Sequence, residues 1–350
     1  MDPQHQVERA TALLELGRPV EAEATAREAL GADPGSVEAL TVLTRALAGQ
    51  RRHAEAVAAG RAAVTADPEH ADAFVALAWA LVGDEQAEEA VAVARSSVAL
   101  APHGWATHHA LGWALHRSDP PRNEEARDAA ARALELEPGA TAAHSVLGLA
   151  LAGLGQRRAG RRVMREGLRI SPDDPYLHNN LAKLDLDRGL RVGRTGRHLR
   201  AAAGGMPQEP VVHQNLDTLV LRFGVRLVWP TLLALFVLRA ELQLGAPWWG
   251  RALTGAVHLT VLGLLVTWFA RQVPRGLRHW ARGVLSRLTL PLRAIASGLL
   301  LFGACVVVTA FAPDRVADLA QDAASVLMWV VAGIGVLAYV AHRWERSGPR

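Results

Sequence analysis

The chain has 350 residues, of which 50% are hydrophobic and only 5% aromatic, a composition typical of helices rich in alanine and leucine. Its formal charge of +4 hides an asymmetry, because residues 1–188 hold 20 basic and 27 acidic residues (20 − 27 = −7), whereas residues 189–350 hold 18 and 7 (18 − 7 = +11). The one lysine follows no glycine-rich loop and the one cysteine lies in an apolar run, which excludes a phosphate-loop nucleotidase, a disulfide framework within the chain and a cysteine-based zinc site.

An internal repeat of 34 residues covers the first half of the chain, because three columns of residues recur with successive spacings of 34, 34, 36 and 34. The two extra residues of the fourth unit fall in the segment SDPPRN, residues 118–123, where a proline pair ends a helix and a loop can accommodate them. The columns are Pro34, Pro68, Pro102, Pro138 and Pro172; Leu43, Leu77, Leu111, Leu147 and Leu181; and Ala22, Ala56, Ala90, Ala126 and Gly160.

These columns resemble the tetratricopeptide repeat (TPR) family over residues 3–190. Gly112 and Gly148 match the small residue that we expect after the first helix of a unit, and each unit ends in the family's proline. The resemblance implies about five and a half pairs of antiparallel helices, stacked because no pair can bury its apolar faces alone. Residues 191–218 are basic and contain glycine and proline, which predicts a linker or capping helix.

Four apolar segments follow, and they predict a transmembrane domain over residues 219–342. An apolar helix needs about 20 residues to cross a bilayer core. The last two segments contain no charge and the second contains only His258, whereas Arg222 and Arg226 leave open whether the first one spans fully. The predicted fold is therefore all-α, a TPR-type helical solenoid followed by a four-helix transmembrane region. The four segments are 220–242, 252–270, 294–312 and 323–341.

The loops between these segments predict the orientation in the membrane. Residues 271–293 hold six arginines and no acidic residue, whereas residues 313–322 hold three acidic residues and one arginine. Because short cytoplasmic loops collect positive charge, we expect the repeats, the first of these loops and the tail 343–350 on the cytoplasmic side of the cell membrane. No signal peptide is expected, since the chain starts without a basic segment followed by an apolar one. Four arginines on one helical face predict contact with lipid headgroups rather than nucleic acid, and they are Arg271, Arg275, Arg278 and Arg282.

The TPR resemblance implies that a protein or peptide partner binds along the concave face made by the first helix of each unit. Trp79 and Trp113, one repeat apart, would form an apolar aromatic surface there, and Asn180 matches an asparagine that in the family often contacts peptide backbone. The alternative is that these side chains pack against neighbouring helices. We expect the double alanine variant of the two tryptophans to lower the melting temperature only slightly. The candidate partner-binding residues are Trp79, His109, Trp113, His116, Asn179, Asn180 and Lys183.

A histidine-rich patch raises the question of a metal site. His109 and His116 are two helical turns apart on one face, whereas His108 is expected to point inward in place of a packing aromatic. A zinc site needs three convergent ligands and this spacing supplies two, so we expect no metal and no cofactor. The remaining members of the patch are His103 and Asp119.

The expected function is that of a membrane-anchored adaptor, since the sequence contains no catalytic motif and an enzyme is not expected. The alternative is that the spans are the working part, as a small channel, a transporter subunit or a membrane enzyme regulated by the repeats. His258 would then be the titratable group inside a span. Glycines in the spans, including Gly263 and Gly303, predict close packing between helices.

Overall fold

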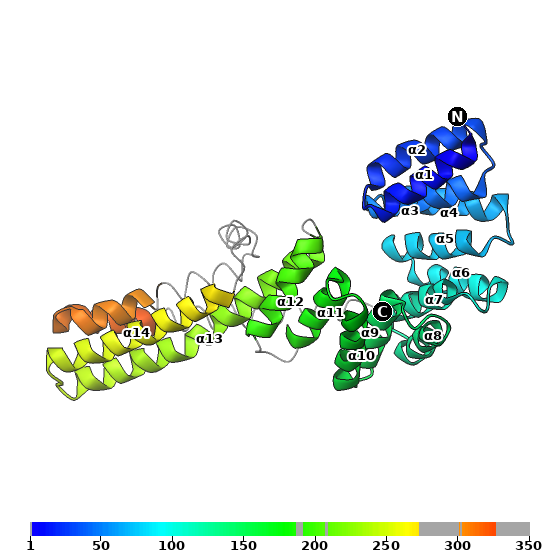
Figure 1. Cartoon of the computed structure of the whole chain (residues 1–350). Helices are drawn as coiled ribbons and strands as arrows, with labels where there is room; N and C mark the ends of the chain where they lie inside the picture. The colour runs from blue at the N-terminus through cyan, green and yellow to red at the C-terminus, as the bar shows by residue number, and fades with distance from the viewer. Residues whose placement is uncertain (1, 187–191, 207–208, 273–300, 302, 327–350) are drawn as a thin grey trace, which may run out of the picture. The chain divides into compact units, whose positions relative to one another are not determined.

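The computed structural model describes residues 2–186, 192–206, 209–272, 301 and 303–326, and the regular secondary structure in these ranges is helical (Figure 1). The predicted all-α class is confirmed for these parts of the chain. The helices are α1 (Pro3–Glu15), α2 (Pro19–Ala32), α3 (Val37–Gly49), α4 (His53–Ala66), α5 (Ala71–Gly83), α6 (Ala87–Leu100), α7 (Trp105–Arg117), α8 (Asn123–Leu136), α9 (Thr141–Gly153), α10 (Arg157–Ile170), α11 (Pro175–Leu186), α12 (Val192–Gly205), α13 (Pro210–Gln243) and α14 (Trp248–Gln272).

The chain divides into two compact units, Met1–Leu184 and Asp185–Arg350. The boundary lies a few residues before the predicted end of the repeats at residue 190. The predicted linker is largely helical, because α12 occupies Val192–Gly205 and α13 begins at Pro210. We describe each unit by itself.

The first unit is a solenoid of helix pairs. Each odd-numbered helix from α1 to α9 packs antiparallel against the even-numbered helix that follows it, and each pair packs on the next. The first helices also contact one another across successive units, α1 with α3, α3 with α5, α5 with α7 and α7 with α9. Elements are closest on the inside of a curve, so the first helices form the inner face of the solenoid and the second helices form the outer face.

Turn chemistry explains where these helices begin. Before α3 the hydroxyl of Ser36 accepts a hydrogen bond from the backbone N–H of Ala39 at 3.2 Å, and before α11 Asp174 accepts one from Leu177 at 2.9 Å. Within most units the two helices are joined by a short turn that needs one left-handed residue, and Gly155 supplies it with φ of +77°. The fourth unit has a longer connection between α7 and α8, which confirms that the SDPPRN segment accommodates the two extra residues.

Small residues let the helices of each pair approach closely. The alanines that recur once per repeat in the second helices are fully buried, as at Ala56 and Ala90. Gly112 and Gly148 lie inside α7 and α9, so their predicted place after the first helix was wrong. A methyl group built on Gly160 would lie 2.4 Å from the carbonyl oxygen of Gly148, which leaves no room for a side chain where α9 and α10 meet.

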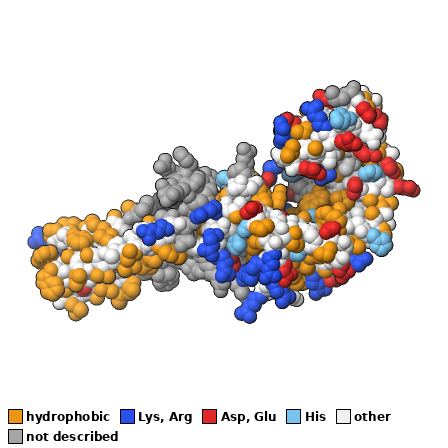
Figure 2. Space-filling view, in the orientation of Figure 1, with side chains coloured by type: hydrophobic (Ala, Val, Ile, Leu, Met, Phe, Trp, Pro, Cys, Tyr) orange, Lys and Arg blue, Asp and Glu red, His pale blue; other side chains and the backbone are white. Residues whose placement is uncertain are grey.

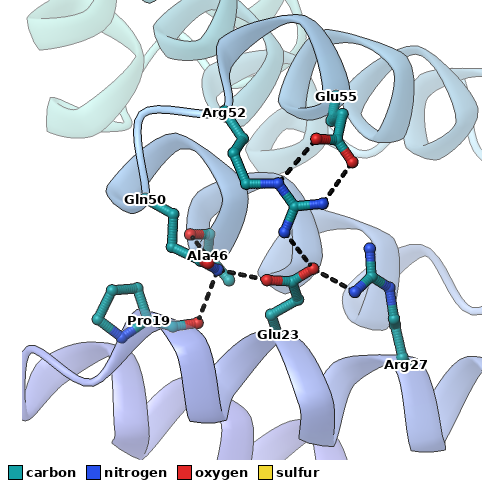
Figure 3. Close-up of polar contacts among 7 residues, drawn as sticks. All are labelled: Pro19, Glu23, Arg27, Ala46, Gln50, Arg52 and Glu55. Carbon is teal, nitrogen blue, oxygen red and sulfur yellow. Dashed lines mark hydrogen bonds and ion pairs between the residues drawn. The ribbon is translucent and has the colours of Figure 1, made fainter.

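A buried carboxylate joins the first two helix pairs of the solenoid (Figure 3). Glu23 of α2 is only 4% exposed and forms ion pairs with Arg27 and, at 2.7 Å, with Arg52 at the start of α4. Gln50 donates a hydrogen bond to the same carboxylate, and Arg52 also pairs with Glu55. Burial raises the pKa of Glu23, but the hydrogen bonds from Gln50 and Arg52 and the charges of Arg27 and Arg52 outweigh burial and lower it. The carboxylate is therefore kept ionised at this joint.

The second unit is built on α13 and α14, with further helical segments at 303–311 and 314–326. Leu235 and Leu238 of α13 pack with Val306 and Ala310. Gly255 of α14 is the close-packing glycine, because a methyl group there would lie 2.4 Å from the Cβ atom of Ala310. Within the described residues nothing lies within 4 Å of a methyl group built on Gly263 or Gly303, so close helix packing at these two glycines is not confirmed.

Among the described residues, Trp248–Trp268 is the one helix long and apolar enough to cross a membrane, with a mean hydropathy of 1.3. It coincides with the second predicted span, and four spans are not confirmed. The first predicted span lies within α13, a helix of 34 residues that begins well before residue 220 and continues through Pro230. Of the last two predicted spans, residues 294–300, 302 and 327–341 lie outside the described residues.

Candidate partner-binding face

The aromatic side chains of the inner face come from α5 and α7. Trp79 is the ninth residue of α5, and Trp113 is the ninth residue of α7. Along α7 the residues Trp105, His109 and Trp113 are spaced by four, so they occupy one face on successive turns, and His116 follows one turn later. We call Trp79, Trp105, His109, Trp113 and His116 the aromatic cluster.

The rings of the aromatic cluster contact one another directly. Trp79 of one repeat stacks on Trp113 of the next, with ring centroids 5.8 Å apart and ring planes inclined by 21°. Trp79 also lies 5.0 Å from the ring of His109, which is 6.0 Å from Trp105, and Trp113 lies 6.0 Å from the ring of His116. These separations are those of favourable aromatic pairs. The structure therefore brings together four of the predicted site residues, Trp79, His109, Trp113 and His116.

The two tryptophans differ in how they pack against the core. Both indoles are half-buried, but Trp113 packs against two core clusters, one that includes Leu115 and one that includes Leu149 and Met164. Trp79 is part of neither cluster. The alternative that these side chains pack against neighbouring helices therefore holds for Trp113, which contacts the core and is also partly accessible.

The histidines of the cluster lie in a low-dielectric setting. His109 is 8% exposed, and burial lowers its pKa to about 4, so the ring is neutral at pH 7. Burial also lowers the pKa of His116, and the positive charges of Lys183 and Arg117 lower it further, against a hydrogen bond with Asn123 at 2.9 Å that raises it. At neutral pH the cluster thus offers aromatic surface with fixed cations beside it.

The predicted polar residues of α11 differ in how open they are to a partner. Asn179 is only 5% exposed and is therefore buried in the unit. Asn180 donates a hydrogen bond to the hydroxyl of Ser145 at 2.6 Å, which links α11 to α9. Lys183 is exposed, and its charge reaches His116. Of these three residues, Asn179 is buried, Asn180 is partly exposed and Lys183 is exposed.

Two members of this face were missed by comparing units with one another. Trp105 is 38% exposed and stacks toward His109, and the guanidinium of Arg117 lies 5.9 Å from the centre of the Trp113 ring. Their spacing of four along α7 is the sequence signal that identifies them, because residues four apart share a helical face.

The histidine-rich patch forms no metal site in the part of the chain that the structure describes, where no three histidine, cysteine or acidic side chains converge. His108 was expected to point inward, and this was wrong. Its Nε2 atom instead lies 2.9 Å from the carbonyl oxygen of Pro102 near the surface, and the buried ring belongs to His109.

Comparisons with known proteins agree with this architecture. The model of the tetratricopeptide repeat family matches residues 7–71 and 45–104. Residues 7–104 therefore carry tetratricopeptide repeats, and the helix pairs continue in the same register beyond the matched residues to α11. No curated protein matches the sequence.

Solved structures of low sequence identity are similar to part of the chain. The anaphase-promoting complex hetero-tetramer Cut9–Hcn1 has a TM-score of 0.51 at 19% identity, over 62% of this chain and 43% of that chain. The thermophilic TPR protein TTC0263 from Thermus thermophilus has a TM-score of 0.48 at 21% identity, over 52% of this chain and 98% of that one. YrrB, a TPR protein with an unusual peptide-binding site, has a TM-score of 0.36 at 22% identity, over 49% and 88%. These likenesses concern the fold alone.

Proposed function

We propose that the chain is a membrane-anchored adaptor that binds a protein partner through the inner face of its TPR unit. The TPR fold is that of a scaffold for protein–protein interaction, and the observation that carries the proposal is the stacked pair Trp79–Trp113 on accessible first-helix positions. Half-buried indoles leave apolar surface in water, and covering it on binding contributes about 1 to 3 kcal/mol per anchoring side chain of the partner. We propose no enzymatic activity.

Membrane attachment is supported by apolar surface on the second unit. Large apolar side chains project from α13 and α14, with Phe236 71% exposed, Leu253 62% and Leu264 66%. Figure 2 shows hydrophobic side chains over the visible surface of this part, with few charges among them. Such extensive apolar surface is costly in water and favourable in lipid. We therefore place the second unit in the cell membrane as a multi-pass anchor, with the repeats on the cytoplasmic side.

The arginines of residues 271–293 are the basis for the proposed orientation of the chain in the membrane. Of the proposed lipid contacts, Arg271 lies in the last turn of α14 and is exposed, whereas Arg275, Arg278 and Arg282 lie outside the described residues. A reporter that is active only in the cytoplasm, fused after residue 287, is expected to give signal, whereas fusion after residue 318 is expected to give none. The opposite pattern would place the repeats outside the cytoplasm.

The adaptor function can be tested with two matched tryptophan variants of the full chain. Partner proteins that copurify with the solubilised protein are expected to be lost from Trp79→Ala and retained by Trp249→Ala, because Trp249 is 61% exposed and belongs to the second unit rather than to the first helices of the repeats. Equal retention by both variants would contradict the proposed role of the aromatic cluster. A chain that washes off membranes with alkaline carbonate would contradict the anchor.

A second candidate function, with the second unit as a small channel, transporter subunit or membrane enzyme, is favoured by polar side chains inside an apolar unit. Arg251 is 2% exposed and pairs with Asp314, and His258 is 7% exposed. Its Nε2 atom has no hydrogen-bond partner within the described structure. Loss of cellular function in a normally expressed His258→Leu variant would favour this candidate, because a plain anchor tolerates leucine at that position.

A further inference from the structure

One column of the inner face has a chemical pattern that the aromatic cluster alone does not show. The ninth residue of each first helix from α3 to α11 occupies the same place in five consecutive units. The two outermost positions are cations, the two tryptophans follow, and a buried leucine completes the apolar centre. We call this column the inner stripe, and its members are Arg45, Trp79, Trp113, Leu149 and Lys183.

Within the part of the chain that the structure describes, the cations of this face form no ion pair with an acidic side chain. Arg45, Arg117 and Lys183 are all exposed, and none forms an ion pair within the described residues. Arg117 instead lies over the Trp113 ring, and the charges of Arg117 and Lys183 both act on His116. Their charge is therefore available to a ligand.

Two exposed arginines of the outer face, in contrast, form ion pairs with the next repeat. Arg61 of α4 pairs with Glu89 of α6 at 2.8 Å, and Arg95 of α6 pairs with Glu125 of α8 at 2.8 Å. The charge of each of these two second-helix arginines is therefore neutralised by a glutamate of the next repeat. These two outer-face ion pairs contrast with Arg45, Arg117 and Lys183 of the inner face, which form no ion pair within the described residues.

Among the acidic residues of these first helices, Asp185 of α11 is buried at 6% exposure, and Glu38 and Asp72 lie about two helical turns from the inner stripe. Glu38 and Asp72 are in the first turns of α3 and α5, seven residues before Arg45 and Trp79. Seven residues correspond to about two turns, or roughly 10 Å along the helix axis. At physiological salt this separation exceeds the Debye length of about 8 Å, so these carboxylates screen the stripe only weakly.

We propose that the inner stripe binds a protein segment with apolar or aromatic residues at its centre and carboxylates on both flanks. This inference rests on the proposed function and specifies the chemistry of the partner. The tryptophans and Leu149 receive the apolar centre, and Arg45 and Lys183 pair with the flanking carboxylates. Indole surface and cations also suit single-stranded nucleic acid, but the charge of −7 over residues 1–188 disfavours a polyanion.

The experiment measures binding of labelled synthetic peptides to the full chain in lipid nanodiscs. Three peptides of equal length are compared: an apolar centre with acidic flanks, the same centre with basic flanks, and a polar centre with acidic flanks. The first is expected to bind most tightly, with an affinity that falls as salt is raised. A single-stranded oligonucleotide serves as the competing ligand.

Charge reversal tests the assignment of the flanks. Arg45→Glu and Lys183→Glu are each expected to weaken binding of the acid-flanked peptide by about two- to tenfold at low salt. Both residues are exposed, so the fold is preserved, and unchanged melting of each variant checks this. Arg158→Glu is the matched control, because Arg158 is exposed on α10, a second helix, and is expected to leave binding unchanged.

The outcomes separate this inference from the proposed function. If the basic-flanked peptide binds as well as the acid-flanked one and Trp79→Ala weakens both, the charge assignment is overturned while the aromatic binding face stands. Two results would contradict both the inference and the proposed binding face. One is that Trp79→Ala changes none of the affinities, and the other is that no peptide binds at concentrations up to about 1 mM. Preferential binding of the oligonucleotide would overturn the inference in favour of nucleic acid.

Discussion

Protonation of His109 is expected to destabilise the TPR unit as the pH falls. The ring is 8% exposed, lies between Trp79 and Trp105, and has its pKa lowered by burial from 6.5 to about 4. Because the folded pKa is lower than the unfolded one, the unfolded chain binds the proton first, and stability is lost as the pH falls from 6.5 toward 4. Two and a half pKa units correspond to about 3 kcal/mol in full, of which about 2 kcal/mol is lost between about pH 8 and about pH 5.

The assay is urea unfolding of the full chain followed by circular dichroism at these two pH values, for the wild type and for His109→Phe. The phenylalanine keeps an aromatic ring beside Trp79 and removes the titrating group, so most of the pH dependence is expected to disappear. A residual slope of the same sign remains from His116, whose pKa burial also lowers. An unchanged pH dependence in the variant would refute the assignment of this instability to His109.

Further predictions concern packing. Gly160→Ala is expected to lower the free energy of unfolding by about 1 to 3 kcal/mol through overpacking, whereas Gly31→Ala, which meets open space in α2, is expected to raise it by up to about 1 kcal/mol in the same urea assay. Trp113→Ala is expected to cost about 2 kcal/mol and to lower the melting temperature by roughly 4 to 8 °C, and a shift near zero would contradict its place in the core. Gly255→Leu is expected to leave the solubilised chain less thermostable than Gly263→Leu does, and the reverse order would contradict the packing of α14.

The repeat architecture could be predicted from spacing alone. Stacked helix pairs need small residues and turn prolines at fixed places, so a column such as Pro34 to Pro172 fixes both the period and the positions of the helices. The same columns placed Trp79 and Trp113 on equivalent positions, and the structure brings them into contact. Positions that repeat were therefore predictable to within a residue or two.

Details that depend on rotation about one helix were not predictable in this way. Adjacent residues on an α-helix differ by about 100° in direction, so His108 and His109 exchange surface and interior when the helix is rotated slightly. Comparison across units also overlooked Trp105, because its equivalents in neighbouring units are Ala71 and Thr141. A glycine of the second unit allows close packing only where another helix approaches it. The hydropathy of the sequence does not predict which helix approaches which glycine.

Site-specific photocrosslinking in cells tests the central claim most directly. A photoreactive amino acid replaces Trp79 on the inner face in one full-length chain and Arg61 on the outer face in another. We expect the chain to be recovered in the membrane fraction, with a discrete crosslinked protein partner from the first chain and none from the second. A crosslinked partner from the second chain alone, or recovery of both chains in the soluble fraction, would contradict this expectation.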